Sequence, residues 1–204
     1  MFRSFSALSL VLAALLLSVS GATAQGTRLL RQPTLSSTQV AFAYGGDLWV
    51  TERSGGTARR LTSTPAVEGD PHFSPDGRWI AFTSNRSGVP QVYVVGVDGG
   101  EPTRLTWYPA GSEARGWTPD GTRVLYASSR ETAPVGYDRL WTVSPRGGPS
   151  TLLPAPWGYD GSYAADGRRL VVDRVTRWDW EWRSYRGGQN TPLTILDLNT
   201  LDEV

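Results

Sequence analysis

The stretch Pro71-His72-Phe73-Ser74-Pro75-Asp76-Gly77-Arg78-Trp79-Ile80-Ala81-Phe82-Thr83-Ser84 has the pattern of a strand, a tight turn and a second strand. Ser74-Pro75-Asp76-Gly77 has turn chemistry: proline fixes φ at one central position, and Asp and Gly tolerate the conformations that follow. The flanking runs are rich in aromatic and branched residues, which is typical of strands. This stretch therefore predicts a β-hairpin.

The same unit returns twice further along the chain. Asp120-Gly121 lies 44 residues after Asp76-Gly77, and Asp166-Gly167 lies a further 46 residues along the chain. The last unit is weaker, because Ala164-Ala165 stands where the first has Ser74-Pro75. A regular interval of this size indicates a repeat architecture, and roughly 40–45 residues suits a four-stranded propeller blade.

Further features keep the same register and support the repeat. An earlier unit, which lacks the Asp-Gly turn, precedes the one at Asp76-Gly77. This earlier unit and the next two each contain a third β-prone run, a glycine pair and a short run that contains leucine. The third runs are Asp47-Leu48-Trp49-Val50, Gln91-Val92-Tyr93-Val94 and Arg139-Leu140-Trp141-Thr142. The glycine pairs are Gly55-Gly56, Gly99-Gly100 and Gly147-Gly148, and the short runs are Arg60-Leu61-Thr62, Arg104-Leu105-Thr106 and Thr151-Leu152-Leu153.

These units predict an all-β chain, a β-propeller with three full four-stranded blades and a partial fourth. We place the blades at about residues 30–65, 66–109, 110–156 and 157–204. The first blade has Leu35-Ser36-Ser37-Thr38 in place of an Asp-Gly turn, as terminal repeats are often atypical. An insertion, Arg174 to Asn190, interrupts the fourth blade, whose third strand we expect within Thr191 to Leu198.

The number of blades bears on how the chain closes. Each blade exposes an apolar face that only its neighbours can cover, and propellers usually have four to eight blades. The chain is then either a minimal ring with an incomplete last blade or the first part of a longer protein, and we favour the second. We expect the chain alone to be marginally stable or to associate through its end blades.

Residues 1–24 have the pattern of a secretion signal. Arg3 supplies a positive charge, Ala7 to Val19 is apolar and uncharged, and Ala22-Thr23-Ala24 matches a cleavage site. The apolar run is shorter than the roughly 20 residues that span a bilayer, which disfavours an uncleaved anchor. We expect a soluble mature chain, residues 25–204, that is periplasmic or secreted and has no stable membrane insertion after cleavage.

Composition argues against several kinds of partner and site. The net charge of +1 favours neither nucleic acid nor an anionic membrane as a partner. The chain has one His and no Cys, which disfavours a zinc site and rules out disulfides. No phosphate loop or dinucleotide fingerprint occurs, so we predict no metal and no cofactor.

We also predict no catalytic residue within this chain. A serine nucleophile usually needs a neighbouring base, and the only histidine is His72. Its counterparts in the next two units are Gly116 and Ser162, so we interpret the position as a variable, structural strand site. The sequence lacks a Gly-x-Ser-x-Gly elbow and has no lysine for a Ser–Lys pair.

One stretch, Arg177-Trp178-Asp179-Trp180-Glu181-Trp182-Arg183, suggests binding. If it is extended, its three tryptophans lie on one face, and exposed they would form a strong contact patch. The alternative is that they pack against the neighbouring blade or cover the edge of the propeller. Arg183 and Arg186 could hold a peptide carboxylate by paired hydrogen bonds. The candidate peptide- or partner-binding residues are Trp178, Trp180, Trp182, Arg183 and Arg186.

The sequence also resembles known families. Phe73 to Arg86, with Gln91-Val92-Tyr93-Val94 and Arg104-Leu105-Thr106, closely resembles TolB-type propeller repeats. Pro33-Thr34-Leu35, Val40-Ala41-Phe42 and Gly46-Asp47-Leu48-Trp49-Val50 look like the opening blade of the tricorn protease family, and Tyr185-Arg186-Gly187-Gly188 is similar to its fourth blade. The resemblance covers about Leu30 to Val204.

The tricorn resemblance implies a six-bladed propeller, followed in the parent protein by a second propeller, a PDZ-like module and a serine-peptidase core. It implies that the parent cleaves peptides and that the propeller filters or guides them towards the active site. The implied partners are peptides and the rest of the parent polypeptide, with a possible homo-oligomer through the parent. The peptidase part is not in this sequence, so no catalytic residue is carried over.

Two other functions stay open. One is a non-enzymatic TolB-like interaction propeller of the cell envelope, and the other is the propeller part of an exported amidohydrolase-like enzyme. The sequence downstream discriminates among the three, because a peptidase core, a stop, or a His-x-His barrel would each favour a different one.

Overall fold

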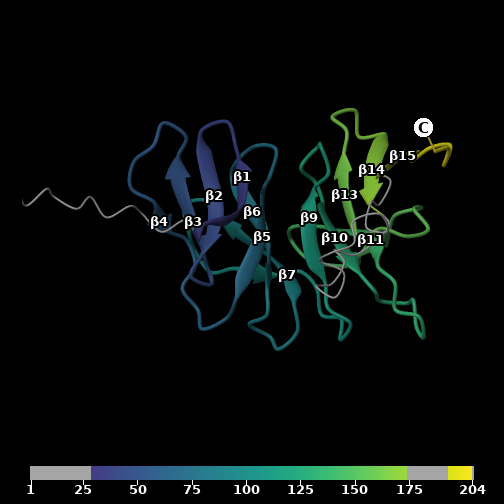
Figure 1. Cartoon of the computed structure of the whole chain (residues 1–204), viewed down its shortest axis with the longest axis horizontal. Helices are drawn as coiled ribbons and strands as arrows, with labels where there is room; N and C mark the ends of the chain where they lie inside the picture. The colour runs from purple at the N-terminus through teal and green to yellow at the C-terminus, as the bar shows by residue number, and fades with distance from the viewer. Residues whose placement is uncertain (1–28, 174–192, 204) are drawn as a thin grey trace, which may run out of the picture.

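The computed structural model describes residues 29–173 and 193–203. These residues form four antiparallel sheets, one after another along the chain, which we call blades 1 to 4 (Figure 1). Blade 1 contains β1 (Arg31–Leu35), β2 (Gln39–Tyr44), β3 (Asp47–Glu52) and β4 (Arg59–Arg60), and blade 2 contains β5 (Glu68–Phe73), β6 (Trp79–Ser84), β7 (Gln91–Gly96) and β8 (Thr103–Arg104). Blade 3 contains β9 (Glu113–Trp117), β10 (Val124–Ser128), β11 (Arg139–Val143) and β12 (Thr151–Leu152), and blade 4 contains β13 (Asp160–Tyr163), β14 (Arg169–Asp173) and β15 (Leu193–Asp197).

Within each blade the strands pair in chain order, and the first strands of successive blades, β1, β5, β9 and β13, lie side by side (Figure 1). This arrangement confirms the predicted propeller with three four-stranded blades and a partial fourth. In blade 4, Glu203 makes an isolated bridge with Leu196 of β15. No helix occurs in the described ranges, and so none there is long and apolar enough to cross a bilayer.

The Asp-Gly turns have the same geometry in blades 2, 3 and 4. In blade 2 the Ser74 amide donates to the Trp79 carbonyl at 2.8 Å, and the Gly77 amide donates to the Ser74 carbonyl at 2.8 Å. Thr118 and Ala164 make the equivalent pairs of bonds in blades 3 and 4, at distances between 2.8 and 2.9 Å. The glycines have φ between 68° and 71°, a left-handed conformation that favours glycine.

The aspartate of each turn fixes the turn from within. Asp76 Oδ1 accepts a hydrogen bond from the Arg78 amide at 3.1 Å, and Asp120 and Asp166 do the same for the residues two positions after them. The Ser74 hydroxyl, together with the Arg78 guanidinium, lowers the pKa of Asp76 to about 2. The carboxylate of this turn therefore stays ionised at every physiological pH.

Successive turns also contact one another. A Cβ added at Gly121 would lie 3.5 Å from Pro75 of the preceding turn, and one at Gly77 would lie 3.4 Å from Ser36 Cβ. These are ordinary van der Waals distances, so the turns lie close together, while glycine at these positions is favoured by the φ of the turn.

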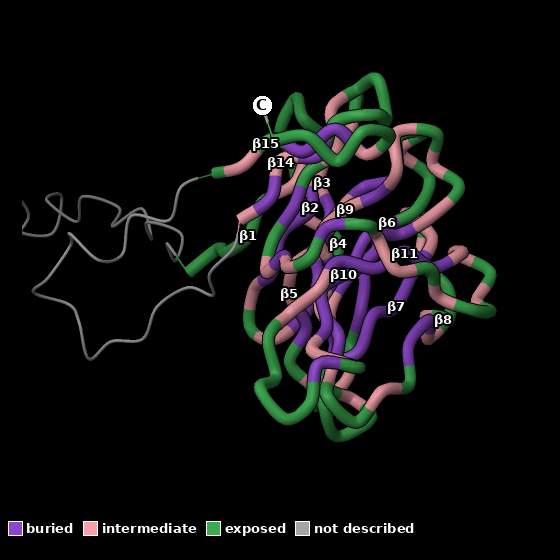
Figure 2. Tube along the Cα trace, turned by 90° about the vertical axis from the view of Figure 1, so that its right-hand side faces the viewer, coloured by how far each residue is buried: buried purple, intermediate pink, exposed green. Residues whose placement is uncertain are grey.

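The core lies between the blades, not within any one of them. One face of blade 1, with Ala41, Leu48 and Val50, packs on Phe73, Ile80, Phe82, Tyr93 and Val95 of blade 2. Blade 2 packs on blade 3 in the same way, and Leu125, Ala127 and Leu140 of blade 3 pack on Leu170 and Val172 of blade 4. Figure 2 shows the buried residues along the central strands and the exposed ones in the connecting loops.

Leu140 shows how tightly the last of these interfaces is packed. A Cβ added at Gly158 or Gly161 would lie only 2.6 or 2.7 Å from atoms of the Leu140 side chain. The absence of a side chain at both glycines therefore makes room for Leu140.

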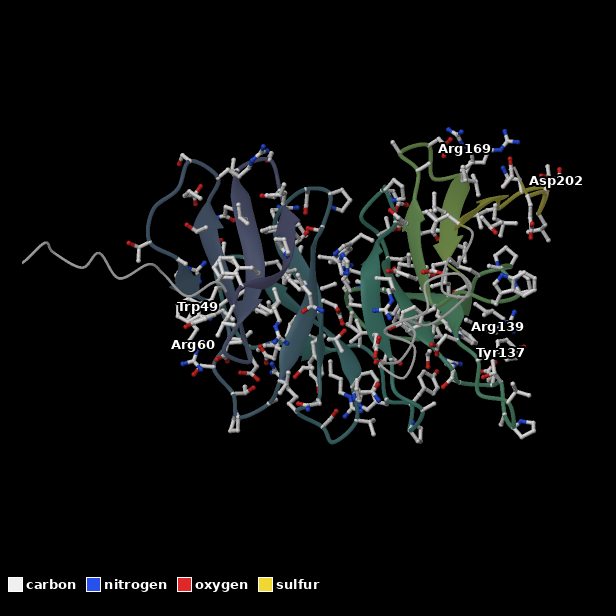
Figure 3. All side chains as sticks on the ribbon, viewed as in Figure 1. Trp49, Arg60, Tyr137, Arg139, Arg169 and Asp202 are labelled. Atoms are coloured by element: carbon white, nitrogen blue, oxygen red, sulfur yellow. The ribbon has the colours of Figure 1, made fainter. Side chains whose placement is uncertain are left out.

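The register of the third strands shows which face of blade 4 has no cover in the described structure. Leu48, Val92, Leu140 and Leu193 occupy equivalent positions, because they pair with equivalent residues of the second strands. These partners are Ala43, Thr83, Ala127 and Asp173, and in blades 2 to 4 each of them lies six residues after the turn glycine. The first three are fully buried, whereas Leu193 is 70% exposed and its neighbour Ile195 is 37% exposed. At the end of the row of blades that is opposite to blade 4, Trp49 and Arg60 lie on the outer side of blade 1 (Figure 3).

This contrast gives a matched pair of substitutions. We expect Leu140→Ala to lower the free energy of unfolding by about 2–5 kcal/mol, because it leaves a cavity between blades 3 and 4. We expect Leu193→Ala to change it by no more than about 0.5 kcal/mol, since the side chain is largely exposed. Urea unfolding of both variants checks this, and an equal loss of stability in the two would show that Leu193 is covered by another segment.

Candidate functional site

The first strands of blades 1 to 3 share an irregularity at the centre of the fold. β1, β5 and β9 each carry one residue more than the partner strand, at 31–34, 69–72 and 114–116, whereas β13 pairs regularly with β14. Such bulges bend a strand and redirect side chains. Gln32 and Asp70 within two of these bulges have φ of 51° and 48°, which is unusual for residues other than glycine.

Four side chains from these strands form a continuous row across all four blades, which we call the polar belt: Gln32, Asp70, Arg115 and Asp160. Gln32 Nε2 donates to the Asp70 carboxylate, and the Asp70 amide donates to Gln32 Oε1 at 3.1 Å. Arg115 Nη1 lies 4.0 Å from Asp70, and its Nε lies 3.7 Å from Asp160. The belt thus connects the blades through polar contacts at their innermost strands.

Arg115 is the centre of the belt. Its side chain is only 7% exposed, forms an ion pair of 2.6 Å with Glu113 and donates from Nε to the Tyr159 carbonyl at 2.8 Å. Burial opposes its charge, but Glu113, Asp160 and Asp70 outweigh that effect and raise the pKa of Arg115 above its usual value. Its guanidinium is therefore charged and already engaged by carboxylates, and it holds blades 2, 3 and 4 together.

A pocket of about 480 Å³ lies beside the belt, between the first strands of the four blades. Each blade contributes the residue at one equivalent register position, paired with Ala41, Ala81, Leu125 and Val171 of the second strands. We call this pocket the inner pocket and these residues the inner quartet: Thr34, His72, Gly116 and Ser162. The rings of Trp117 and Tyr163 border the same pocket.

His72 is the titratable member of the quartet. Burial lowers the pKa of its imidazole, Asp70 and Asp160 oppose this effect, and Arg115 adds to it. The Trp117 indole donates to the His72 carbonyl at 2.9 Å and so joins blades 2 and 3. Among the residues that the structure describes, no hydrogen bond joins the imidazole to a serine or threonine hydroxyl, so no nucleophile–base pair is assembled there.

The residues predicted from sequence as a binding stretch, Trp178, Trp180, Trp182, Arg183 and Arg186, lie outside the described residues and stay a prediction. The inner quartet was not predicted as a site. Its signal was the common register of His72, Gly116 and Ser162, which we interpreted as a variable structural position. The sequence shows that register, but only the packing of the blades brings the four positions around one pocket.

Two sequence comparisons place this chain among known proteins. A family model described as the tricorn protease N-terminal beta propeller domain matches residues 27–204. A Streptomyces coelicolor protein named as tricorn protease homolog 2 is 39% identical over 178 residues, which cover 81% of this chain and 15% of that protein. The chain thus spans less than one sixth of this relative's length.

Solved structures agree on the fold. The crystal structure of the tricorn protease gives a TM-score of 0.70 at 24% identity and covers 86% of this chain and 18% of its own. TolB from Acinetobacter baumannii gives a TM-score of 0.66 at 23% identity, with 85% of this chain and 42% of TolB covered. Both likenesses show a shared propeller architecture.

The surroundings of His72 predict its titration. We expect the imidazole to titrate below its usual pKa of 6.5, so the unfolded chain binds the proton first and stability falls as the pH drops below about 6.5. Removing the opposing carboxylate with Asp70→Asn lowers this pKa further, because Asp70 stabilises the charged form. Proton NMR of the single histidine measures the midpoint, with the exposed Asp98→Asn as control. A midpoint at or above 6.5 contradicts the burial of His72.

Proposed function

Because the chain belongs to the family of tricorn protease N-terminal β-propeller domains, we propose that it is the propeller portion of an exported tricorn-like serine peptidase. In this role it guides or filters peptides and performs no bond cleavage itself. The observation that carries the proposal is the family match over residues 27–204, together with the small share of the relative's length that the chain represents.

The inner pocket supports a role with peptides. Its lining includes Thr34 and Ser162, which carry hydroxyl groups, and the aromatic residues Trp117 and Tyr163. Peptide groups hydrogen-bond and pack against this combination without needing a strong charge, and ligand pockets typically combine apolar walls with a few polar groups. The chain's net charge of +1 also suits a mixed partner such as a peptide better than a polyanion.

Arg115 has a supporting role in this proposal. Because its guanidinium is occupied by Glu113, Asp70 and Asp160, it does not serve as a free anchor for a peptide carboxylate. It keeps the inner strands at a fixed spacing, so the pocket is held open by the belt. The rest of the parent polypeptide is the partner that supplies catalysis.

A second candidate function is a TolB-like interaction propeller of the cell envelope, which binds protein partners and has no peptidase attached. The structural likeness to TolB favours it, since TolB shares the architecture and most of this chain superposes on it. The two candidates differ in whether the complete polypeptide hydrolyses peptides.

Peptidase activity of the complete polypeptide that carries this chain is the direct test. We expect it to hydrolyse peptides and to react with a serine-directed fluorophosphonate, because a serine nucleophile is activated in such a core. Mass spectrometry of the labelled protein should place the modified serine outside residues 25–204. A modified serine within that range contradicts the scaffold role, and a polypeptide without hydrolysis favours the TolB-like function.

Export is a separate expectation. We propose that the segment up to Ala24 directs export and is removed, so the mature protein begins at Gln25. Amino-terminal sequencing of protein from the periplasm or medium of the native host checks this. Protein that keeps Met1 and stays in the cytoplasmic fraction contradicts it.

A further inference from the structure

Among the described residues, the innermost strand of each blade has one edge without a strand partner. β1 pairs only with β2, β5 only with β6, β9 only with β10 and β13 only with β14. An unpaired strand edge offers backbone groups to an extended chain, and peptides bind proteins in this way by adding a strand. The four edges belong to strands that lie side by side around the inner pocket.

Part of this inner edge is already used by contacts between blades. The His72 carbonyl accepts from the Trp117 indole, and the Tyr159 carbonyl accepts from Arg115. The Asp70 amide donates to the Gln32 side chain. These bonds, which come from the belt and from the rim of the pocket, limit where another chain can approach.

Gly116 is the position on this inner edge where another main chain can come close. It is the one member of the inner quartet without a side chain, and a Cβ added there would meet no atom within 4 Å. Its φ of 144° is a conformation that favours glycine. A glycine inside a strand often marks a site where another backbone comes close.

The other three members of the quartet determine which side chain of a bound chain fits into the pocket when the main chain of that chain lies beside Gly116. The hydroxyls of Thr34 and Ser162 and the imidazole of His72 are groups that can hydrogen-bond to a peptide, and burial lowers the pKa of the imidazole, which favours its uncharged form. Arg115, the cation that lines the pocket, is saturated by carboxylates. Asp160 and Glu113 beside it stay partly exposed, which disfavours an acidic side chain.

From these observations we propose that the inner pocket binds an extended peptide whose main chain lies against Gly116. A small, uncharged side chain of the peptide faces Thr34, His72 and Ser162. This inference rests on the proposed function and names the class of peptide that the propeller would select.

The test is hydrogen–deuterium exchange of the complete polypeptide that carries this chain, with an alanine hexapeptide as the probe. We expect the peptide to slow exchange in the segments 113–117 and 160–163 by about tenfold, since added strand pairing protects backbone amides. A glutamate hexapeptide should give no protection in the same segments. This readout is local and does not depend on hydrolysis.

Two variants fill the pocket from partly or fully exposed positions, Ser162→Trp and Thr34→Trp, and both should abolish the protection. Ser87→Trp, at an exposed loop position outside the pocket, is the matched control and should keep it. Exchange in the core segment 92–95 confirms that each variant is folded. Gly116 is left unchanged, because its φ makes any substitution there strained.

The outcomes separate this inference from the proposed function. Loss of protection in the two pocket variants alone supports the peptide site, whether or not the polypeptide hydrolyses peptides. No protection in the native protein, or equal protection in all variants, overturns the peptide site. Hydrolysis by the polypeptide then still supports the peptidase assignment.

Discussion

The packing of each blade against the next one builds the core of this protein. Each sheet is too thin to bury both faces by itself, so its apolar side chains become a core only when the next sheet covers them. Phe73 and Ile80 show this, because their partners are Ala41 and Leu48 of the preceding blade. The same contact recurs along the chain, and Leu193 on blade 4 shows the equivalent surface without cover in the described residues.

Two features besides the apolar core bear on how the blades lie against one another. At one end, each Asp-Gly turn lies close to the preceding turn, as shown by Gly121, where an added Cβ would lie 3.5 Å from Pro75. At the inner strands, the polar belt connects Gln32, Asp70, Arg115 and Asp160. Hydrogen bonds and ion pairs are directional, so they fix positions that non-directional burial leaves free.

The belt and the inner pocket are parts of one arrangement. The bulges that carry Asp70 and Arg115 redirect side chains towards the neighbouring blades, and the residues that follow the bulges, among them His72 and Gly116, line the pocket. A site of this kind depends on the spacing of the blades more than on any single residue. For this reason, a propeller can keep its fold while its inner residues differ between relatives, and function is argued from the site.

The blades, their strands and their turns were predictable from the sequence, because Ser74-Pro75-Asp76-Gly77 and its repeats encode local backbone geometry that needs no distant partner. It also showed that His72, Gly116 and Ser162 share a register. That these positions surround one pocket and that Arg115 joins three blades became visible in the folded chain alone, since both depend on bulges and on residues far apart in the sequence. Bulges leave no clear local pattern in β1, β5 and β9, and long-range contacts between blades follow from packing, which a repeat interval does not specify.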